Sequence, residues 1–275
     1  MDWARAKNII LIILILLNIF LFINVISVKN SFNETGQYQK IAKQALETAG
    51  VIVTGALPNY SGQLGRISYT EKDLLELQEV INELTGLNYN DASGSDELYW
   101  ENGGRRLQFL ADNFVYTDKT GSDTFNAEDE KKLNKQIMAW IKAKGLSDRD
   151  LKQKSLGKNG NIVTVEYIQQ YGRMPLFSNK IVFAIEDSKL IRVEGSKRIF
   201  YDIKLSKQKD EIISPHIVLL TNKDSVQGVI SSIVLGYLRP KDEELYDVPV
   251  WQMSLLSGSE IYFNAYTGEY INLSN

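Results

Sequence analysis

The chain is poor in two residue types that often carry out catalysis, histidine and cysteine. It has one histidine, His216, and no cysteine, so the sequence excludes thiol catalysis, disulfide exchange and thiolate-bound metals. A zinc site would need an almost entirely carboxylate ligand set, which is unusual. The HExxH, P-loop and G-x-S-x-G motifs are all absent. We therefore expect no catalytic residue, no metal site and no cofactor, and hence a protein that is not an enzyme.

The remaining ionisable residues fit a structural role better than a chemical one. His216 follows Ser214-Pro215, a capping residue and a proline typical of a helix start, where we expect a solvated or capping side chain. The densest acidic group, Asp242-Glu243-Glu244, lies in a loop flanked by proline and lysine and should be solvated. Because carboxylates are plentiful, an acid/base pair for glycoside cleavage stays an alternative.

An amide within a long apolar run is a stronger candidate for a functional residue. The run Ile9–Val28 is interrupted only by Asn18, Asn24 and Ser27. Twenty helical residues span about 30 Å, the thickness of a bilayer's hydrocarbon core. A side-chain amide there seeks a partner on another helix, so Asn18 predicts a contact between membrane helices; a bond to its own helix backbone is the alternative. Helical spacing places four apolar residues on the same face: Leu11, Leu14, Phe22 and Val25.

Charges before the apolar run predict its orientation. Arg5 and Lys7 precede it, against a single acidic residue, Asp2. Cationic residues stay on the cytoplasmic side, so we expect residues 1–8 in the cytoplasm and the long C-terminal region outside it. The alternative is a signal peptide that is cleaved near Val25-Ile26-Ser27. The apolar region of a signal peptide usually spans only about 7–15 residues. The length of the run favours a retained, single-pass anchor in the cell membrane.

The rest of the chain has the composition of a folded, solvated region. The whole chain has a net charge of −3 and no basic stripe, which gives no support for nucleic-acid binding. Without cysteine, an extracytoplasmic region must hold itself together by core burial alone. We expect two α+β domains, residues 29–120 and 121–275, which meet at the polar segment Asp118–Ser122.

Apolar residues at helical spacing predict three main helices outside the membrane. In the first, the pattern predicts that Ile41, Ala45 and Ala49 are buried, with Leu46 alongside. The second has Thr70 and Asp73 in the pattern of a capping box. The third begins near Asn126. The buried stripes that we expect are Leu74, Leu77, Ile81 and Leu84 in the second helix, and Leu133, Ile137 and Ile141 in the third.

The hydrophobic period changes from 3.6 to 2 at Ile162, which predicts strands through most of the remaining chain. A helix followed by antiparallel strands recurs up to three times, from near Gln37, Asn126 and Ser214. This order predicts an α+β fold in which helices pack on one face of antiparallel sheets.

Both ends of the chain resemble a known family. Met1-Asp2-Trp3, Lys7 and Leu17-Asn18-Ile19-Phe20-Leu21 are similar to the opening of the YycI (WalI) family. Three C-terminal segments are similar to it as well, and the last also resembles the ending of PepSY-like modules: Val234-Leu235-Gly236-Tyr237, Pro249-Val250-Trp251 and Asn264-Ala265-Tyr266-Thr267-Gly268.

The resemblance implies a non-enzymatic regulator. Proteins of this family have one membrane helix and an extracytoplasmic region of PepSY-like or YycH-like α+β modules. With YycH they bind the sensor histidine kinase YycG (WalK) of the YycG/YycF (WalK/WalR) two-component system, which acts in cell-wall homeostasis of Gram-positive bacteria. Contacts among membrane helices matter for that control, and Asn18 lies in the matching segment. The family supplies no site residue outside the membrane.

Two other functions are compatible with the residues. The chain could be a membrane-anchored, PepSY-like inhibitor of an extracellular peptidase, or an anchored wall hydrolase that uses two carboxylates. Co-purification with a peptidase would favour the first of these, and loss of wall cleavage on mutation of a carboxylate pair would favour the second.

Overall fold

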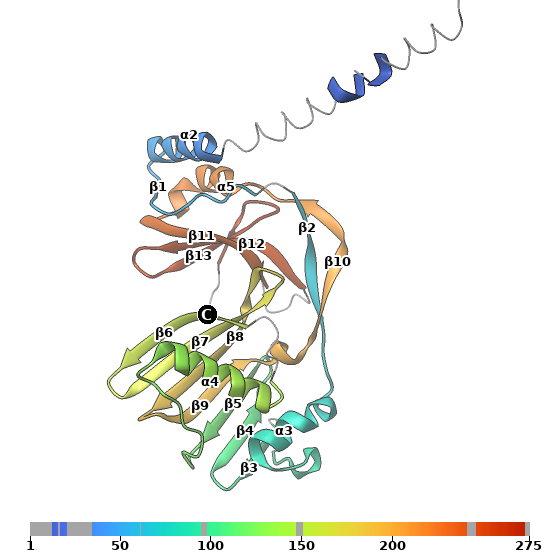
Figure 1. Ribbon diagram of the computed structural model, residues 1–275, viewed down its shortest axis with the longest axis vertical. Coiled ribbons are helices and arrows are strands. Elements are labelled where there is room, and N and C mark those ends of the chain that lie inside the picture. Colours follow the sequence, from blue (N-terminus) through green and yellow to red (C-terminus); the bar gives the residue numbers. More distant parts are fainter. Residues whose placement is uncertain are drawn as a thin grey trace, which may run out of the picture.

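Strands dominate the structure, a computed structural model that describes residues 13–15, 17–20, 35–60, 62–94, 98–146, 151–240 and 246–272. The fold is α+β, as the sequence predicts. Figure 1 shows two lobes, one above the other, with a long two-stranded ribbon along one side. We call the described residues between 71 and 201 the lower lobe, and those from 35 to 60 and from 212 to 272 the upper lobe.

The lower lobe is an antiparallel sheet covered on one face by two helices, α3 (Gln78–Thr85) and α4 (Glu130–Ala143). Its strands lie in the order β6-β7-β8-β9-β5-β4-β3. Three short 3-10 turns belong to this lobe: η1 (Leu74–Leu77) before α3, η2 (Tyr89–Asp91) between α3 and β3, and η3 (Lys197–Phe200) after β9. The strand bounds are β3 Tyr99–Asn102, β4 Arg105–Phe109, β5 Asn113–Asp118, β6 Leu151–Asn159, β7 Ile162–Tyr171, β8 Met174–Glu186 and β9 Lys189–Ser196.

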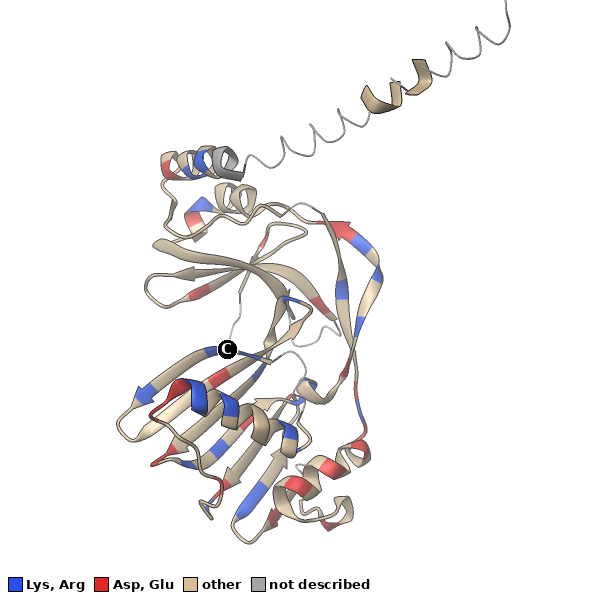
Figure 2. Ribbon diagram, in the orientation of Figure 1, with Lys and Arg blue, Asp and Glu red and all other residues tan. Residues whose placement is uncertain are grey.

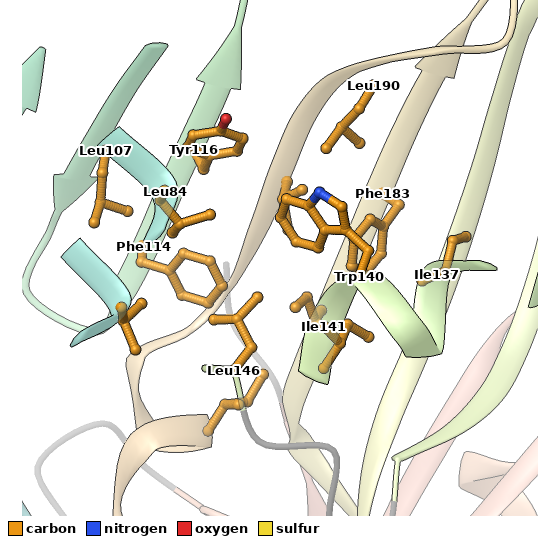
Figure 3. Close-up of a cluster of buried hydrophobic side chains, with 14 of the residues drawn as sticks. Leu84, Leu107, Phe114, Tyr116, Ile137, Trp140, Ile141, Leu146, Phe183 and Leu190 are labelled. Atoms are coloured by element: carbon orange, nitrogen blue, oxygen red, sulfur yellow. The ribbon is translucent and has the colours of Figure 1, made fainter. Parts of the chain in front are cut away.

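The core of the lower lobe lies between the helices and the sheet (Figure 3). The predicted stripe of the third helix is confirmed, because Leu133, Ile137 and Ile141 of α4 are all buried. Trp140 packs edge-on against Phe183 of β8, with ring centroids 5.6 Å apart. Its indole nitrogen donates a hydrogen bond to Asp123 (2.9 Å), which satisfies the polar end of a buried ring.

The second helix is also confirmed, with its cap three residues later than expected. Asp73, not Thr70, is the capping residue, and its partner in the capping box is Glu76. Thr70 instead ends a strand, where its backbone pairs with Asp202. Gly86 closes α3 at φ 75°, a conformation that glycine adopts without steric cost.

The upper lobe packs α2 (Thr35–Thr48) and α5 (Pro215–Thr221), followed by the turn η4 (Lys223–Ser225), over a smaller sheet. The buried face of α2 differs from the predicted one. Ala42 and Leu46 are buried, whereas Ile41 is 60% exposed and Ala45 is exposed too. The helix packs against α5 and β1 with a face rotated away from the predicted stripe. The strand bounds are β1 Ile52–Val53, β11 Val229–Leu238, β12 Tyr246–Leu255, β13 Glu260–Asn264 and β14 Tyr270–Ile271.

The ribbon consists of β2 (Gln63–Thr70) and β10 (Asp202–Glu211), paired antiparallel with a register shift between Leu205 and Lys209. Its strand β2 also pairs with the start of β12, and β11 pairs with β8 through Tyr237 and Leu176, so one sheet runs through both lobes.

Apolar side chains from both lobes fill the space between them. Ile168 of β7 and Phe177 of β8 belong to the same buried cluster as Val250 of β12 and Tyr262 of β13. Phe177 and Tyr262 meet edge-on, with centroids 5.4 Å apart. The lobes are therefore packed against each other through a shared core.

The division into two domains expected from the sequence, residues 29–120 and 121–275, stays a prediction, and one sheet crosses the expected boundary. Strand β5, before the expected boundary, pairs with β9, after it. The polar segment Asp118–Ser122 is a structured turn: Asp118 is buried, accepts a hydrogen bond from the Thr120 amide (2.7 Å) and lies 3.6 Å from Arg105. Its polar composition reflects these local bonds rather than a linker.

Candidate functional site

The predicted membrane contact is described in part. Residues 13–15 and 17–20 are helical, and the Asn18 amide donates a hydrogen bond to the carbonyl of Leu14 (2.9 Å). This is the self-bonded arrangement given above as the alternative. Three of the predicted contact residues, Leu11, Phe22 and Val25, lie outside the described residues. Within the part of the chain that the structure describes, no helix has both the length and the apolarity needed to cross a bilayer.

The ionisable residues singled out in the sequence do not form a reactive cluster. His216 lies in the first turn of α5, where partial burial lowers its pKa. The acidic run Asp242-Glu243-Glu244 lies outside the described residues. Across the described ranges, no group of three His, Cys, Asp or Glu side chains has a metal-binding arrangement.

A buried polar network lies where the ribbon meets the two lobes. Asp247 of β12 is fully buried; its carboxylate accepts hydrogen bonds from Tyr69 of β2 (2.7 Å) and from Arg198 of η3 (3.1 Å). Burial raises the pKa of Asp247, while the bond from Tyr69 and the charge of Arg198 oppose that shift. The Arg198 guanidinium also lies over the Tyr69 ring, 5.3 Å from its centroid. Three segments far apart in the sequence are fixed together here.

The network continues into the lower lobe through two amides. Asn179 of β8 donates hydrogen bonds to the Tyr69 hydroxyl (3.4 Å) and to Gln169 Oε1 of β7 (2.8 Å). Both amide side chains are buried. The five side chains join η3 and four strands.

A second polar contact connects the facing surfaces of the lobes. Lys154 of β6 lies 2.8 Å from Glu260 of β13, which also accepts a hydrogen bond from the Tyr262 hydroxyl (2.8 Å). Burial opposes ionisation of Glu260, but the bonds from Lys154 and Tyr262 outweigh it and lower its pKa. Tyr262 accepts in turn from Gln252. These residues form an ordered contact between lobes rather than a reactive pair.

Sequence reasoning missed both networks. One signal was available: Asp247 is a lone carboxylate within the apolar strand Tyr246–Val250, and a buried charge requires a partner. Nothing in the sequence identifies Arg198 or Tyr69 as that partner.

A family model described as YycI protein matches residues 29–266. The chain belongs to the YycI family. The resemblance seen in the sequence is thereby confirmed. Membership supports a regulatory role in the YycG/YycF two-component system, and hence an association with that system.

Two solved structures are similar to this chain, and the first of them supports the fold alone. An uncharacterized protein from Eubacterium rectale is 13% identical to this YycI-family chain, with a TM-score of 0.50 over 81% of this chain and 89% of the other. The Bacillus megaterium YpeB C-terminal domain is 12% identical, with a TM-score of 0.41 over 76% of this chain and 100% of the other. Among curated proteins, none matches this chain.

Proposed function

We propose that this YycI-family chain is a non-enzymatic, membrane-anchored regulator that binds the YycG (WalK) sensor kinase together with a YycH-like partner. The match of the family model over residues 29–266 carries this proposal. We also propose that its two lobes are PepSY-like or YycH-like modules.

The proposal includes a single-pass topology, with Ile9–Val28 in the cell membrane, the N-terminus in the cytoplasm and both lobes outside. The length of the apolar run and the preceding Arg5 and Lys7 support it.

We further propose that the membrane helix takes part in binding, through Asn18 and the face that carries Leu11, Leu14, Phe22 and Val25. An amide offers two N–H donors and an accepting oxygen. The bond to Leu14 uses one donor, so the other donor and the oxygen stay available to a second helix. Lipid provides no hydrophobic drive between helices, so packing and such polar groups determine their association.

Replacement of Asn18 by leucine tests the proposal. Asn18→Leu removes one interhelical bond and should weaken co-purification with the kinase from solubilised membranes by about 1 kcal/mol, roughly fivefold. Asn24→Leu, nearer the outer end of the run, is the matched control and should bind as the wild type does.

The outcomes separate the parts of the proposal. If the kinase co-purifies equally with both variants, binding depends on the lobes, and the helix is only an anchor. If the wild-type chain captures an extracellular peptidase and no kinase, the regulatory proposal fails and the inhibitor alternative replaces it.

A further inference from the structure

A cavity of about 710 Å³ opens on the lower lobe beside the base of the ribbon. Its volume is within the usual range of about 300–1,000 Å³ for ligand sites. Residues from η1, α3, η3 and the adjoining ends of β7 and β10 form its walls. The lining residues that matter below are Glu76, Glu79, Gln169, Tyr171, Tyr201 and Asp202.

The buried network fixes the orientation of one of these residues, Gln169. The Tyr69 hydroxyl donates its only hydrogen to Asp247, so it must accept from Asn179, and the Asn179 amide nitrogen faces Tyr69. The same nitrogen donates to Gln169 Oε1. The Gln169 side-chain nitrogen is on the opposite branch of the same amide group, so it points away from Asn179.

That nitrogen is an unused donor at the cavity wall. Gln169 is only 5% exposed and lines the cavity, yet its Nε2 group makes no hydrogen bond within the described structure. The nitrogen is not among the fully buried, unpartnered side-chain atoms of the described residues, so it reaches the open cavity, where it can donate a hydrogen bond to a ligand that accepts one. A carbonyl oxygen is such an acceptor.

The rim of the cavity selects for positive charge. Glu76, Glu79 and Asp202 contribute three carboxylates, against one cation, Lys72, which lies 3.6 Å from Asp202 in an exposed ion pair. Figure 2 shows acidic residues along α3 and the turn before it. Exposed pairs of this kind contribute about 0–1 kcal/mol, so a ligand cation could displace Lys72 at little cost.

Two phenol rings complete the wall. Tyr171 and Tyr201 line the cavity near these carboxylates. Aromatic faces attract ammonium and guanidinium groups and also cover the methylene stem behind such a group.

We propose that this cavity binds a peptide segment that carries a lysine or arginine side chain. A peptide provides both features that the walls require, a backbone carbonyl for Gln169 and a side-chain cation for Glu76, Glu79 and Asp202. The cavity also adjoins the first residues of β10, which among the described strands pairs with β2 alone, so an extended segment can lie along its other edge.

Calorimetry on the full chain in detergent micelles, without kinase, tests this site with three blocked peptides. The probes are acetyl-Gly-Gly-Lys-Gly-Gly-amide, the same peptide with Nε-acetyl-lysine, and the same peptide with norleucine. Only the first carries the cation, and it should bind up to about fivefold more tightly than the others, because an ion pair with exposed carboxylates is worth up to about 1 kcal/mol.

Variants assign the two interactions. Glu79→Gln should weaken binding of the lysine peptide by about two- to threefold and leave the acetylated peptide unchanged. Gln169→Leu should weaken all three peptides by a similar factor, because each has the backbone carbonyl. Glu83→Gln, on the same helix but outside the cavity, is the control and should bind as wild type does.

The proposal is overturned if the lysine and norleucine peptides bind equally, if none binds, or if Glu83→Gln has the same effect as Glu79→Gln. Since no kinase is present, this result is independent of the co-purification experiment above. Either proposal can fail while the other stands.

Discussion

At the scale of single residues, the Asp247 carboxylate determines how three separate segments meet. A fully buried charge is tolerated only when it is paired and hydrogen-bonded, and Tyr69 and Arg198 provide both. The same network orients Gln169 at the cavity wall through Asn179. One buried acid thus connects the junction of the lobes to the candidate peptide site.

Removal of the Arg198 guanidinium should destabilise the fold strongly. Arg198→Met leaves a buried carboxylate without its cation, which costs about 3–5 kcal/mol near neutral pH. Arg192→Met is the matched control: its partner Glu194 forms an exposed pair, so the loss should be about 0–1 kcal/mol. Urea unfolding followed by tryptophan fluorescence measures both.

The deficit of Arg198→Met should also depend on pH. Burial raises the folded-state pKa of Asp247, and removal of the Arg198 charge, which opposes that shift, should raise it further. Because the folded state binds the Asp247 proton more tightly than the unfolded state does, the stability that this proton contributes is fully present below the ordinary pKa of an aspartate. It is lost as the pH rises through the raised folded-state pKa. The variant should therefore lose less stability at about pH 5 than at about pH 7. An equal loss at both values would show that lost packing, not charge, is responsible.

At the scale of elements, the local sequence pattern predicts helices and strands that have one buried face, and it misses those that do not. The pattern identifies α4 and the alternating strands β7 to β9, because each has one apolar and one polar face. Most of β10 is polar on both faces, so no alternation marks it as a strand. Its place is fixed by pairing with β2, more than a hundred residues away.

One glycine of the family-like C-terminal segment has a clear structural reason at this scale. A Cβ atom at Gly236 would lie 2.6 Å from the carbonyl oxygen of Pro175 and 2.5 Å from the Phe177 ring. Only glycine lets β11 approach β8 so closely, at the point where the sheet passes from one lobe to the other.

Two isoleucines at predicted stripe positions should respond very differently to truncation. Ile137 of α4 is fully buried, so Ile137→Ala removes packed methyl groups and should cost about 2–5 kcal/mol. Ile41 of α2 is largely exposed, and Ile41→Ala should change stability by no more than about 0.5 kcal/mol. Unfolding of the full chain in urea measures the difference. Comparable losses would mean that Ile41 is covered, by the membrane or by a partner, in the sample measured.

At the scale of the whole molecule, the arrangement of the lobes depends on contacts between distant residues. Lys154 and Glu260 are over a hundred positions apart, and the apolar cluster between the lobes draws on β7, β8 and β11 to β14. No short-range pattern encodes such contacts. The fold class could therefore be predicted from the sequence, whereas the junction and the cavity beside it could not.

The topology of the whole chain can be tested with single cysteines, because the natural sequence has none. Ser257→Cys places a thiol in an exposed turn of the upper lobe, and Ala4→Cys places one before the apolar run. If residues 1–8 are cytoplasmic, a membrane-impermeant maleimide should label Ser257→Cys in intact cells, and Ala4→Cys only after permeabilisation. The reverse pattern would invert the orientation. A labelled Ser257→Cys product that is shortened at its N-terminus and released from the membrane would show that the apolar run is a cleaved signal, and the proposed contact of Asn18 with the kinase would then fail with it.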